Sequence, residues 1–523
     1  MSDRARGRAA LWLLSLLASA CASGGAIVRQ ALPPRLQVDF SLEGPAEPGA
    51  AGDGQGLWQG TGPIELTVEA AVLGALAHNR DLQVRRLTPE IQDAFAEIAR
   101  GRYDPELFAG VQAGHERSVE VARSTGALFD VEGTELTSEV GVRQAFSTGT
   151  QAELSLSHSY SDSSRTPAQQ RSRIGLSLTQ ALLRGLGPSV NLAAIEQADL
   201  EVQASRYELR GYAEALVAEA EIAYWRYVLA LREIAIYEES LKLAQKQQQE
   251  IEQEIEVGTM AQTESAAACA EVAVRRQDLI DARSLVEQRR LRLLRLLGAD
   301  LARPVAAVSE PTIEPAPIED LDERLALAQR SRAEINEAAL HLEERRLETV
   351  VTRDGLLPRL DVFVQLGKTG FAGDFGGSFR NLGEDKFDLL GGLSFSALLR
   401  NREAEGSHRG AVAAHRQAKL AVANLRQLVA LEVRLAADEV ERARQQIAAS
   451  AATRVLQEKK VQVEQERFRV GESTALMLAQ AQRDQLSSRI AEIRALVDYR
   501  AAMVQLCLAE GSLLERRGIR LGR

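Results

Sequence analysis

The spacing of apolar and polar residues changes several times along the chain, and each spacing predicts a different kind of element. From Leu66 to Arg100 the apolar residues recur at helical intervals, and this pattern stops before Pro105, because proline cannot continue a helix. Residues 106–181 then alternate with a period of two, as at Leu154 and Leu156. The alternation predicts strands that have one apolar and one polar face.

The next segment, from Ser189 to Arg303, contains no proline and is far too long for one globular helix. The repeat positions between Leu216 and Ile255, all apolar except Glu238 and Gln248, advance by 39 residues in 11 steps. This spacing is typical of helices that supercoil around their neighbours. The run is interrupted at Val257-Gly258-Thr259, where we expect the chain to reverse into a helical hairpin. An arm of about 70 residues is on the order of 100 Å long, so this part is a rod.

The second half of the chain repeats the first at three successive shifts of 253, 216 and 213 residues. The superposed positions are Pro105 with Pro358, residues 79–82 with 332–335, Ala181-Leu182-Leu183-Arg184 with the identical residues 397–400, Gly258 with Gly471, and Gly298 with Gly511. The single shift of 213 residues superposes two glycines that are 40 residues apart on two other glycines. Chance matches between Ala-rich helices are not expected to do this. The chain therefore duplicates one unit.

The repeats define the expected organisation of the chain. The drop in shift from 253 to 216 places 37 surplus residues in the strand region of the first copy, as either a longer surface loop or an added strand pair. The expected segments are a first repeat at 63–303 with strands at about 106–181 and a hairpin tip near 258, a linker at 304–317, a second repeat at 318–515 with strands at about 359–397 and a tip near 471, and a basic tail at 516–523.

The N-terminal residues lie outside the repeats. Residues 1–20 combine arginines with a short, largely apolar stretch, which is typical of a signal peptide. The small residues before Cys21 resemble a bacterial lipobox, in which the cysteine is acylated, although Ala18 stands where leucine is usual. The alternative is cleavage at another small residue, with Cys21 incidental. Residues 21–62 are rich in Gly, Ala and Pro, and we expect them to form a lipidated flexible tether.

Composition excludes several classes of protein. The net charge is −10 and no basic, aromatic cluster is present, so nucleic acid is not expected as a partner. The three cysteines are too few for a disulfide scaffold, and no apolar run reaches the length of a spanning helix. Aromatic residues make up only 4%, which argues against a chain that is mostly outer-membrane barrel. Nearly half of these aromatics, however, lie within residues 103–181 and 358–399.

The polar residues offer little catalytic chemistry. The six histidines are scattered, and His115-Glu116 lacks the second histidine of a zinc-protease motif. His408 and His415 are spaced to share a helix face, but two ligands make a weak metal site. We therefore expect no enzymatic activity, no metal and no cofactor.

Each copy has the order helix, strands, long helix, glycine reversal, long helix, and this order resembles the TolC-like outer membrane efflux protein family. The resemblance implies a mainly α fold with a membrane β part, in which a homotrimer pools its strands into one outer-membrane β-barrel of twelve strands. Its helices would form a hollow α-barrel through the periplasm. Members are passive exit channels of tripartite efflux or type I secretion systems, so the implied partners are a periplasmic adaptor, an inner-membrane pump and outer-membrane lipid. Lipobox-bearing members are common, which supports Cys21 as a lipid anchor.

The resemblance also implies functional residues at the two hairpin reversals, which in the family form the periplasmic tip and contact the adaptor. The matching residues are Val257, Gly258, Thr259, Val470, Gly471, Glu472 and Ser473. The alternative is that these glycines only close the helical hairpins.

The best-known relatives carry carboxylates six and nine residues after each glycine, where acidic rings set cation preference. The matching residues here are Glu264 and Ala267, and then Met477 and Gln480, so a double acidic ring is not expected. Glu264 and Met477 form the candidate pore gate. Glu264 as a solvated helix residue is the alternative.

A second class of function is a structural periplasmic coiled-coil lipoprotein without channel activity, whose duplicated rods act as spacers. Strand length discriminates between the two, because a membrane barrel needs about 9 to 11 residues per crossing. The four clearest strand segments are near that length, at residues 150–160, 172–181, 359–367 and 386–397. This favours the channel.

Overall fold

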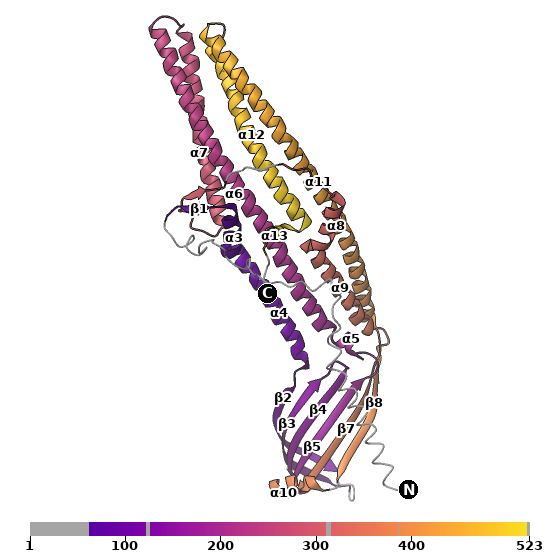
Figure 1. Cartoon of the computed structure of the whole chain (residues 1–523). Coiled ribbons are helices and arrows are strands. Elements are labelled where there is room, and N and C mark those ends of the chain that lie inside the picture. The colour runs from indigo at the N-terminus through magenta and orange to yellow at the C-terminus, as the bar shows by residue number, and fades with distance from the viewer. Residues whose placement is uncertain (1–61, 122–125, 310–314, 385, 520–523) are drawn as a thin grey trace. The chain divides into compact units, whose positions relative to one another are not determined.

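The computed structural model describes residues 62–121, 126–309, 315–384 and 386–519 (Figure 1). The expected signal peptide, Cys21 and the tether up to residue 61 lie outside these residues, as does the end of the basic tail. The described chain divides into two compact units. We call residues 91–203 and 340–420 the sheet unit, and residues 62–90, 204–339 and 421–519 the helical unit.

The order of elements occurs twice along the chain. The first repeat contains β1 (Ile64–Leu66), α3 (Val68–His78), α4 (Arg80–Arg100), β2 (Glu106–Val121), β3 (Leu128–Ala145), β4 (Thr150–Ser163), β5 (Thr166–Ala181), α5 (Pro188–Asn191), α6 (Ala193–Glu256) and α7 (Thr263–Leu296). The second contains β6 (Val305–Ala307), α8 (Leu321–Ser331), α9 (Ala333–Asp354), β7 (Arg359–Ala372), α10 (Phe375–Arg380), β8 (Phe387–Ser396), α11 (Arg402–Arg469), α12 (Ala475–Glu510) and α13 (Leu513–Arg516). The predicted fold class, a mainly helical and duplicated chain, is confirmed.

The long predicted arms are single helices. α6 has 64 residues and α11 has 68, so each is on the order of 100 Å long at about 1.5 Å per residue. Each arm is followed by a shorter helix, of 34 residues in α7 and 36 in α12. None of the helices in the described part of the chain is long and apolar enough to cross a bilayer.

In both repeats the first two helices meet at a break that is bonded to the end of the hairpin. At the break between α3 and α4, the Asn79 side chain accepts a hydrogen bond from the Leu82 amide at 2.9 Å and donates one to the Leu296 carbonyl at 3.0 Å. At the break between α8 and α9, Arg332 Nη1 donates to the Leu508 carbonyl at 2.8 Å. Asn79 and Arg332 are superposed by the 253-residue shift, so two different side chains hold equivalent junctions.

The same junctions contain the two glycines that follow the shorter helices. Gly298 and Gly511 have φ values of +62° and +66°, in the left-handed region that favours glycine. A Cβ atom on Gly298 would lie 2.2 Å from the His78 carbonyl oxygen, and one on Gly511 would lie 2.9 Å from Arg332 Cα. The glycines therefore allow each hairpin end to approach the neighbouring backbone closely.

The main core of the helical unit surrounds Tyr224 and Trp225, which are almost completely buried. The Tyr224 hydroxyl donates to the Leu66 carbonyl at 3.0 Å, and the Tyr227 hydroxyl donates to the Val305 carbonyl at 2.8 Å. These bonds attach both strands of the parallel pair β1–β6 to α6. The segment predicted as a linker therefore contains a short strand.

The sheet unit contains one six-stranded sheet with the order β2-β3-β4-β5-β7-β8. All of its neighbouring strands are antiparallel. The first repeat supplies four strands and the second supplies two. The surplus residues of the first repeat therefore form an added strand pair, and the alternative of a longer surface loop is wrong.

Candidate functional site

The two hairpin reversals have the same local geometry, and Figure 1 shows them at the free ends of α6–α7 and α11–α12. Gly258 and Gly471 have φ values of +84° and +78°, and a Cβ atom on either would meet nothing within 4 Å. The following amides bond back over five residues, from Thr259 to the Glu254 carbonyl at 2.9 Å and from Glu472 to the Arg467 carbonyl at 2.8 Å. This is the bonding of a glycine helix terminus.

The reversals also expose apolar surface. Val257 is 78% exposed and Val470 is 68% exposed, and each precedes its glycine. Ser473 donates from its hydroxyl to Glu464 Oε2 at 2.9 Å, which orders the second reversal. All seven residues predicted for adaptor contact therefore lie at the two tips, where two valines face solvent.

The two hairpins are joined just behind their tips. Ile251, Ala268 and Ala475 are buried together in one small cluster. Beside it, Glu264 Oε2 accepts a hydrogen bond from the Ala475 amide at 2.9 Å. The Ala475 amide belongs to the first turn of α12, where free N–H groups attract a carboxylate. Glu264 of the first hairpin therefore caps a helix of the second.

The other gate candidate, Met477, lies in the same turn of α12 and is half exposed. Its amide donates to the Thr474 hydroxyl at 3.3 Å, so Thr474 is the N-cap of α12. This helix start was not predicted from the sequence, although a threonine before an apolar run is a recognised helix signal. The bond from Glu264 to Ala475 had no sequence signal, because it joins different repeats.

Replacing Glu264 with alanine should loosen the first turn of α12. The loss of a carboxylate cap costs about 1 kcal/mol, so hydrogen exchange of the Ala475 and Met477 amides should be roughly five-fold faster. The control is Glu256→Ala, which removes an exposed carboxylate at the end of α6. Equal exchange in both variants would show that the Glu264 contact adds no stability.

The six-stranded sheet has two faces of opposite character. Cross-strand pairing places Leu107, Val142, Leu154, Leu176, Leu366 and Leu389 in one row, with one apolar residue from each strand. Neighbouring positions on this face are also apolar, including Ala109, Val111, Val140, Leu156, Ile174, Leu178, Val364 and Leu393. Most of these large side chains are exposed in the single chain. These residues form an apolar band that is largely exposed, although α10 packs against one end of the same face at His158 and Ser172.

The opposite face carries glycine, serine and charged residues. One of its rows contains Phe108, Gly141, Ser155, Gly175, Gly367 and Asp388. Arg143 forms two 2.8 Å bonds with Glu106, and Arg173 Nη2 lies 2.6 Å from Asp388 Oδ2. A sheet with an apolar outer face and a polar inner face is the pattern of a transmembrane barrel.

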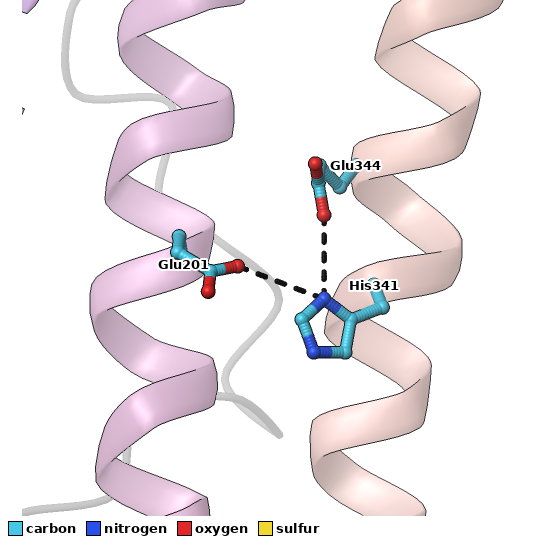
Figure 2. A group of neighbouring side chains, drawn as sticks. All are labelled: Glu201, His341 and Glu344. Atoms are coloured by element: carbon cyan, nitrogen blue, oxygen red, sulfur yellow. Dashed lines mark hydrogen bonds and ion pairs between the residues drawn. The ribbon is translucent and has the colours of Figure 1, made fainter. Parts of the chain in front are cut away.

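A histidine and two carboxylates lie between α6 and α9 (Figure 2). His341 Nδ1 lies 3.3 Å from Glu344 Oε2 and 3.7 Å from Glu201 Oε2. Imidazole and carboxylate groups are ligands for zinc and other divalent metals, so this cluster is the candidate metal site of the described residues. The sequence gives no signal for this cluster, because Glu201 lies in the other repeat.

The carboxylates of this cluster are also close to a second basic group. The pKa of Arg345 is raised by its hydrogen bond with Glu348, and further by the charges of Glu344 and Glu201. Arg345 therefore offsets part of the carboxylate charge without a metal ion, and we expect a chelator to leave the thermal unfolding midpoint unchanged. Differential scanning calorimetry with and without EDTA measures this. A lower midpoint in EDTA that added zinc restores would assign a cation to the cluster.

Glu214 of α6 should make stability depend on pH. Burial raises the pKa of its carboxyl from 4.5 to about 7, although Arg210 lies 3.2 Å away and opposes the shift. The folded chain holds this proton more tightly than the unfolded chain, so stability is present below about pH 4.5 and declines as pH rises through about 7. Glu214→Gln should remove the decline, with a gain of about 1–3 kcal/mol at pH 8. Urea unfolding at pH 5 and pH 8 tests this, and an unchanged decline in the variant would contradict it.

Comparison with solved structures shows the same fold in bacterial membrane proteins. A membrane protein from Pseudomonas aeruginosa is 22% identical with a TM-score of 0.64, covering 92% of this chain and 98% of that chain. The CmeC outer membrane channel of Campylobacter jejuni is 16% identical with a TM-score of 0.64, covering 91% and 95%. The MtrE outer membrane channel of Neisseria gonorrhoeae is 17% identical with a TM-score of 0.62, covering 85% and 89%. No curated protein sequence gives a significant match.

The chain thus combines a two-faced sheet with duplicated helical hairpins. The outer membrane efflux protein family matches residues 72–299 and 325–512, and the chain belongs to that family. The resemblance noted from the sequence is confirmed. The family is one of outer-membrane efflux channels, which work with adaptor and inner-membrane pump proteins.

Proposed function

We propose that three copies of this chain form the exit channel of a tripartite efflux or type I secretion system. The two-faced sheet is the observation that carries the proposal. In such a channel the apolar band would face lipid and the polar face would line the lumen. A sheet in lipid must close, because an open edge leaves backbone groups without hydrogen bonds. One chain has two open edges, which favours an oligomer, and the family resemblance supports three copies.

Each part of the chain then has one task in passive conduction. The polar face of the sheet offers water and solutes a hydrophilic path across the outer membrane. The family resemblance implies that the long helices form the periplasmic part of the path, and the exposed Val257 and Val470 offer apolar contacts to an adaptor. The inner-membrane pump supplies the energy. Acylated Cys21 anchors the N-terminal tether in lipid.

Conductance of the purified protein in planar bilayers tests the proposal. A channel gives stepwise conductance, whereas a coiled-coil spacer lipoprotein gives none. The Leu176→Arg variant is a matched control, because a charge in the apolar band should abolish insertion. Absence of steps from protein that is shown to be folded and trimeric would overturn the channel function.

Crosslinking tests the adaptor contact at the tips. Thr259→Cys and Ser473→Cys, each in a Cys269→Ser background, should label the adaptor in membranes. Cys269 is replaced because it is free and exposed. The control is Ser284→Cys, an exposed position further along α7. Labelling from Ser284→Cys alone would place the adaptor away from the tips.

The gate is proposed to include Glu264 and Met477. An acidic ring in a narrow pore attracts cations. The hydrogen bond from the Ala475 amide holds the Glu264 carboxylate at the start of α12. Glu264→Gln should reduce the cation preference of the conductance, measured as the reversal potential in a salt gradient. Glu256→Gln should leave that preference unchanged. An unchanged reversal potential in Glu264→Gln would exclude this gate.

A further inference from the structure

The sheet of one chain has two open edges, because its two outermost strands each pair on one side only. β2 forms one edge and β8 forms the other. Besides its unpaired backbone, β8 exposes Leu389, Leu393 and Phe395. Open strand edges do not occur within the hydrocarbon layer of a membrane, so each edge needs a further strand.

The outer strand pair, β2 and β3, has the same two faces as the rest of the sheet. Leu107 pairs with Val142 on the apolar face, and Val142 continues to Leu154 of β4. The intervening pair of Phe108 and Gly141 lies on the polar face. The outer pair therefore extends the membrane layer of the sheet and is not a loop that folds over it.

The strand directions favour one kind of closure. Consecutive strands are antiparallel throughout. Because the sheet has six strands, an even number, β2 and β8 run in opposite directions. β8 of one copy therefore meets β2 of the next copy as an antiparallel neighbour, and the alternation continues around a closed ring.

We propose that the barrel contains eighteen strands, six from each copy, and that β8 of each copy pairs with β2 of the next. This rests on the three-copy channel proposed above. Barrel diameter grows roughly linearly with strand number, so this barrel is about half again as wide as one of twelve strands, and barrels of this size leave an aqueous channel. The polar face of the outer pair contains four glycines, which have no side chains to narrow the channel. They are Gly110, Gly114, Gly133 and Gly141.

Strand tilt sets the register of the new pair. Within the sheet, Leu389 of β8 is level with Leu107 of β2 through consecutive pairs. A tilt of about 35–45° displaces the register by roughly six to nine residues across six strands. If the residue opposite Leu389 moves along β2 toward Val121, β8 still lies opposite β2. A displacement in the other direction would carry β8 past the start of β2. Ser394 of β8 then faces Phe108 or Gly110 of the next copy on the polar face.

Disulfide crosslinking of the full chain in outer membranes tests this pairing. In a Cys269→Ser, Cys507→Ala background, one series combines Ser394→Cys with a cysteine on the polar face of β2. The β2 positions are Phe108, Gly110 and Gln112. The matched series combines Ser394→Cys with a cysteine on the polar face of β4. The β4 positions are Ser155, Ser157 and Ser159.

The eighteen-stranded barrel predicts covalent dimers and trimers in the β2 series, at least ten-fold more abundant than in the β4 series. β4 is already paired on both sides within its own chain. In a twelve-stranded barrel, β4 forms the edge, so crosslinks in the β4 series alone would overturn the proposal and keep the channel function.

A folding control uses Ser177→Cys with Gln365→Cys, which are neighbours on β5 and β7 and should form a disulfide within one chain. If this control forms and neither series gives linked subunits, β8 does not join the copies and the proposal is wrong. The channel function is judged separately, by conductance of the unmodified protein.

Discussion

Leu176→Arg should largely prevent assembly of the folded protein in outer membranes. Leu176 lies within the apolar row, between Leu154 on β4 and Leu366 on β7. If this row faces the middle of the bilayer, an arginine there costs about 2–4 kcal/mol, which is a large part of the stability of a typical domain. The measurement is made on chain extracted from outer membranes into detergent. It gives the fraction of the chain that stays folded at temperatures below the thermal unfolding transition of the original protein.

The matched control is Ser177→Arg, one residue further along the same strand. Ser177 lies on the polar face, where it pairs with Glu153 on one side and Gln365 on the other. An arginine there faces water and a carboxylate, so folding should remain within about 0.5 kcal/mol of the original. Equal loss in both variants would show that the two faces of the sheet do not differ in environment, which would remove the main support for the barrel.

The number of strands could not be predicted from the sequence, although the strand region could. Alternation runs through residues 150–181 with no clear break, because β4 and β5 are joined by only Ser164 and Arg165. This two-residue turn lacks the glycine or asparagine that usually marks a tight hairpin. The 37 surplus residues therefore stayed open between a loop and a strand pair until the register was known.

The hairpin tips were predictable for a local reason. Gly258 and Gly471 stand alone in long stretches of helix-forming residues, and a helix reversal needs a residue that tolerates positive φ. The contacts around them were not predictable. Glu264 reaches Ala475 and His341 reaches Glu201 only because segments far apart in sequence pack together. Periodicity identifies which face of a helix is buried, but it does not identify the partner.

The duplication contained more information than its separate motifs. One shift superposes Asn79 on Arg332 and another superposes Gly298 on Gly511. In the structure these pairs meet: Asn79 bonds to the end of α7, which Gly298 follows, and Arg332 bonds to the end of α12, which Gly511 follows. The two repeats therefore share the contact between the first helix break and the end of the hairpin, as well as the order of their elements.

This junction carries the second large expected effect. Gly298→Ala should destabilise the helical unit by about 3 kcal/mol or more. An alanine at a φ of +62° costs about 1–2 kcal/mol by itself. Its Cβ atom would also lie 2.2 Å from the His78 carbonyl oxygen, so the backbone at the end of α3 must move. The adjacent Leu297 is completely buried, and the movement would disturb its packing in the main core.

Gly258→Ala separates the two causes, because Gly258 has a similar φ of +84° but nothing within 4 Å of the added atom. It should cost only the conformational part, about 1–2 kcal/mol. Urea unfolding followed by circular dichroism at a helical wavelength compares both variants with the original chain. Gly511→Ala should resemble Gly298→Ala, since its Cβ atom would lie 2.9 Å from Arg332 Cα. If all three variants lose equal stability, close packing at the junction contributes nothing and only the positive φ values matter.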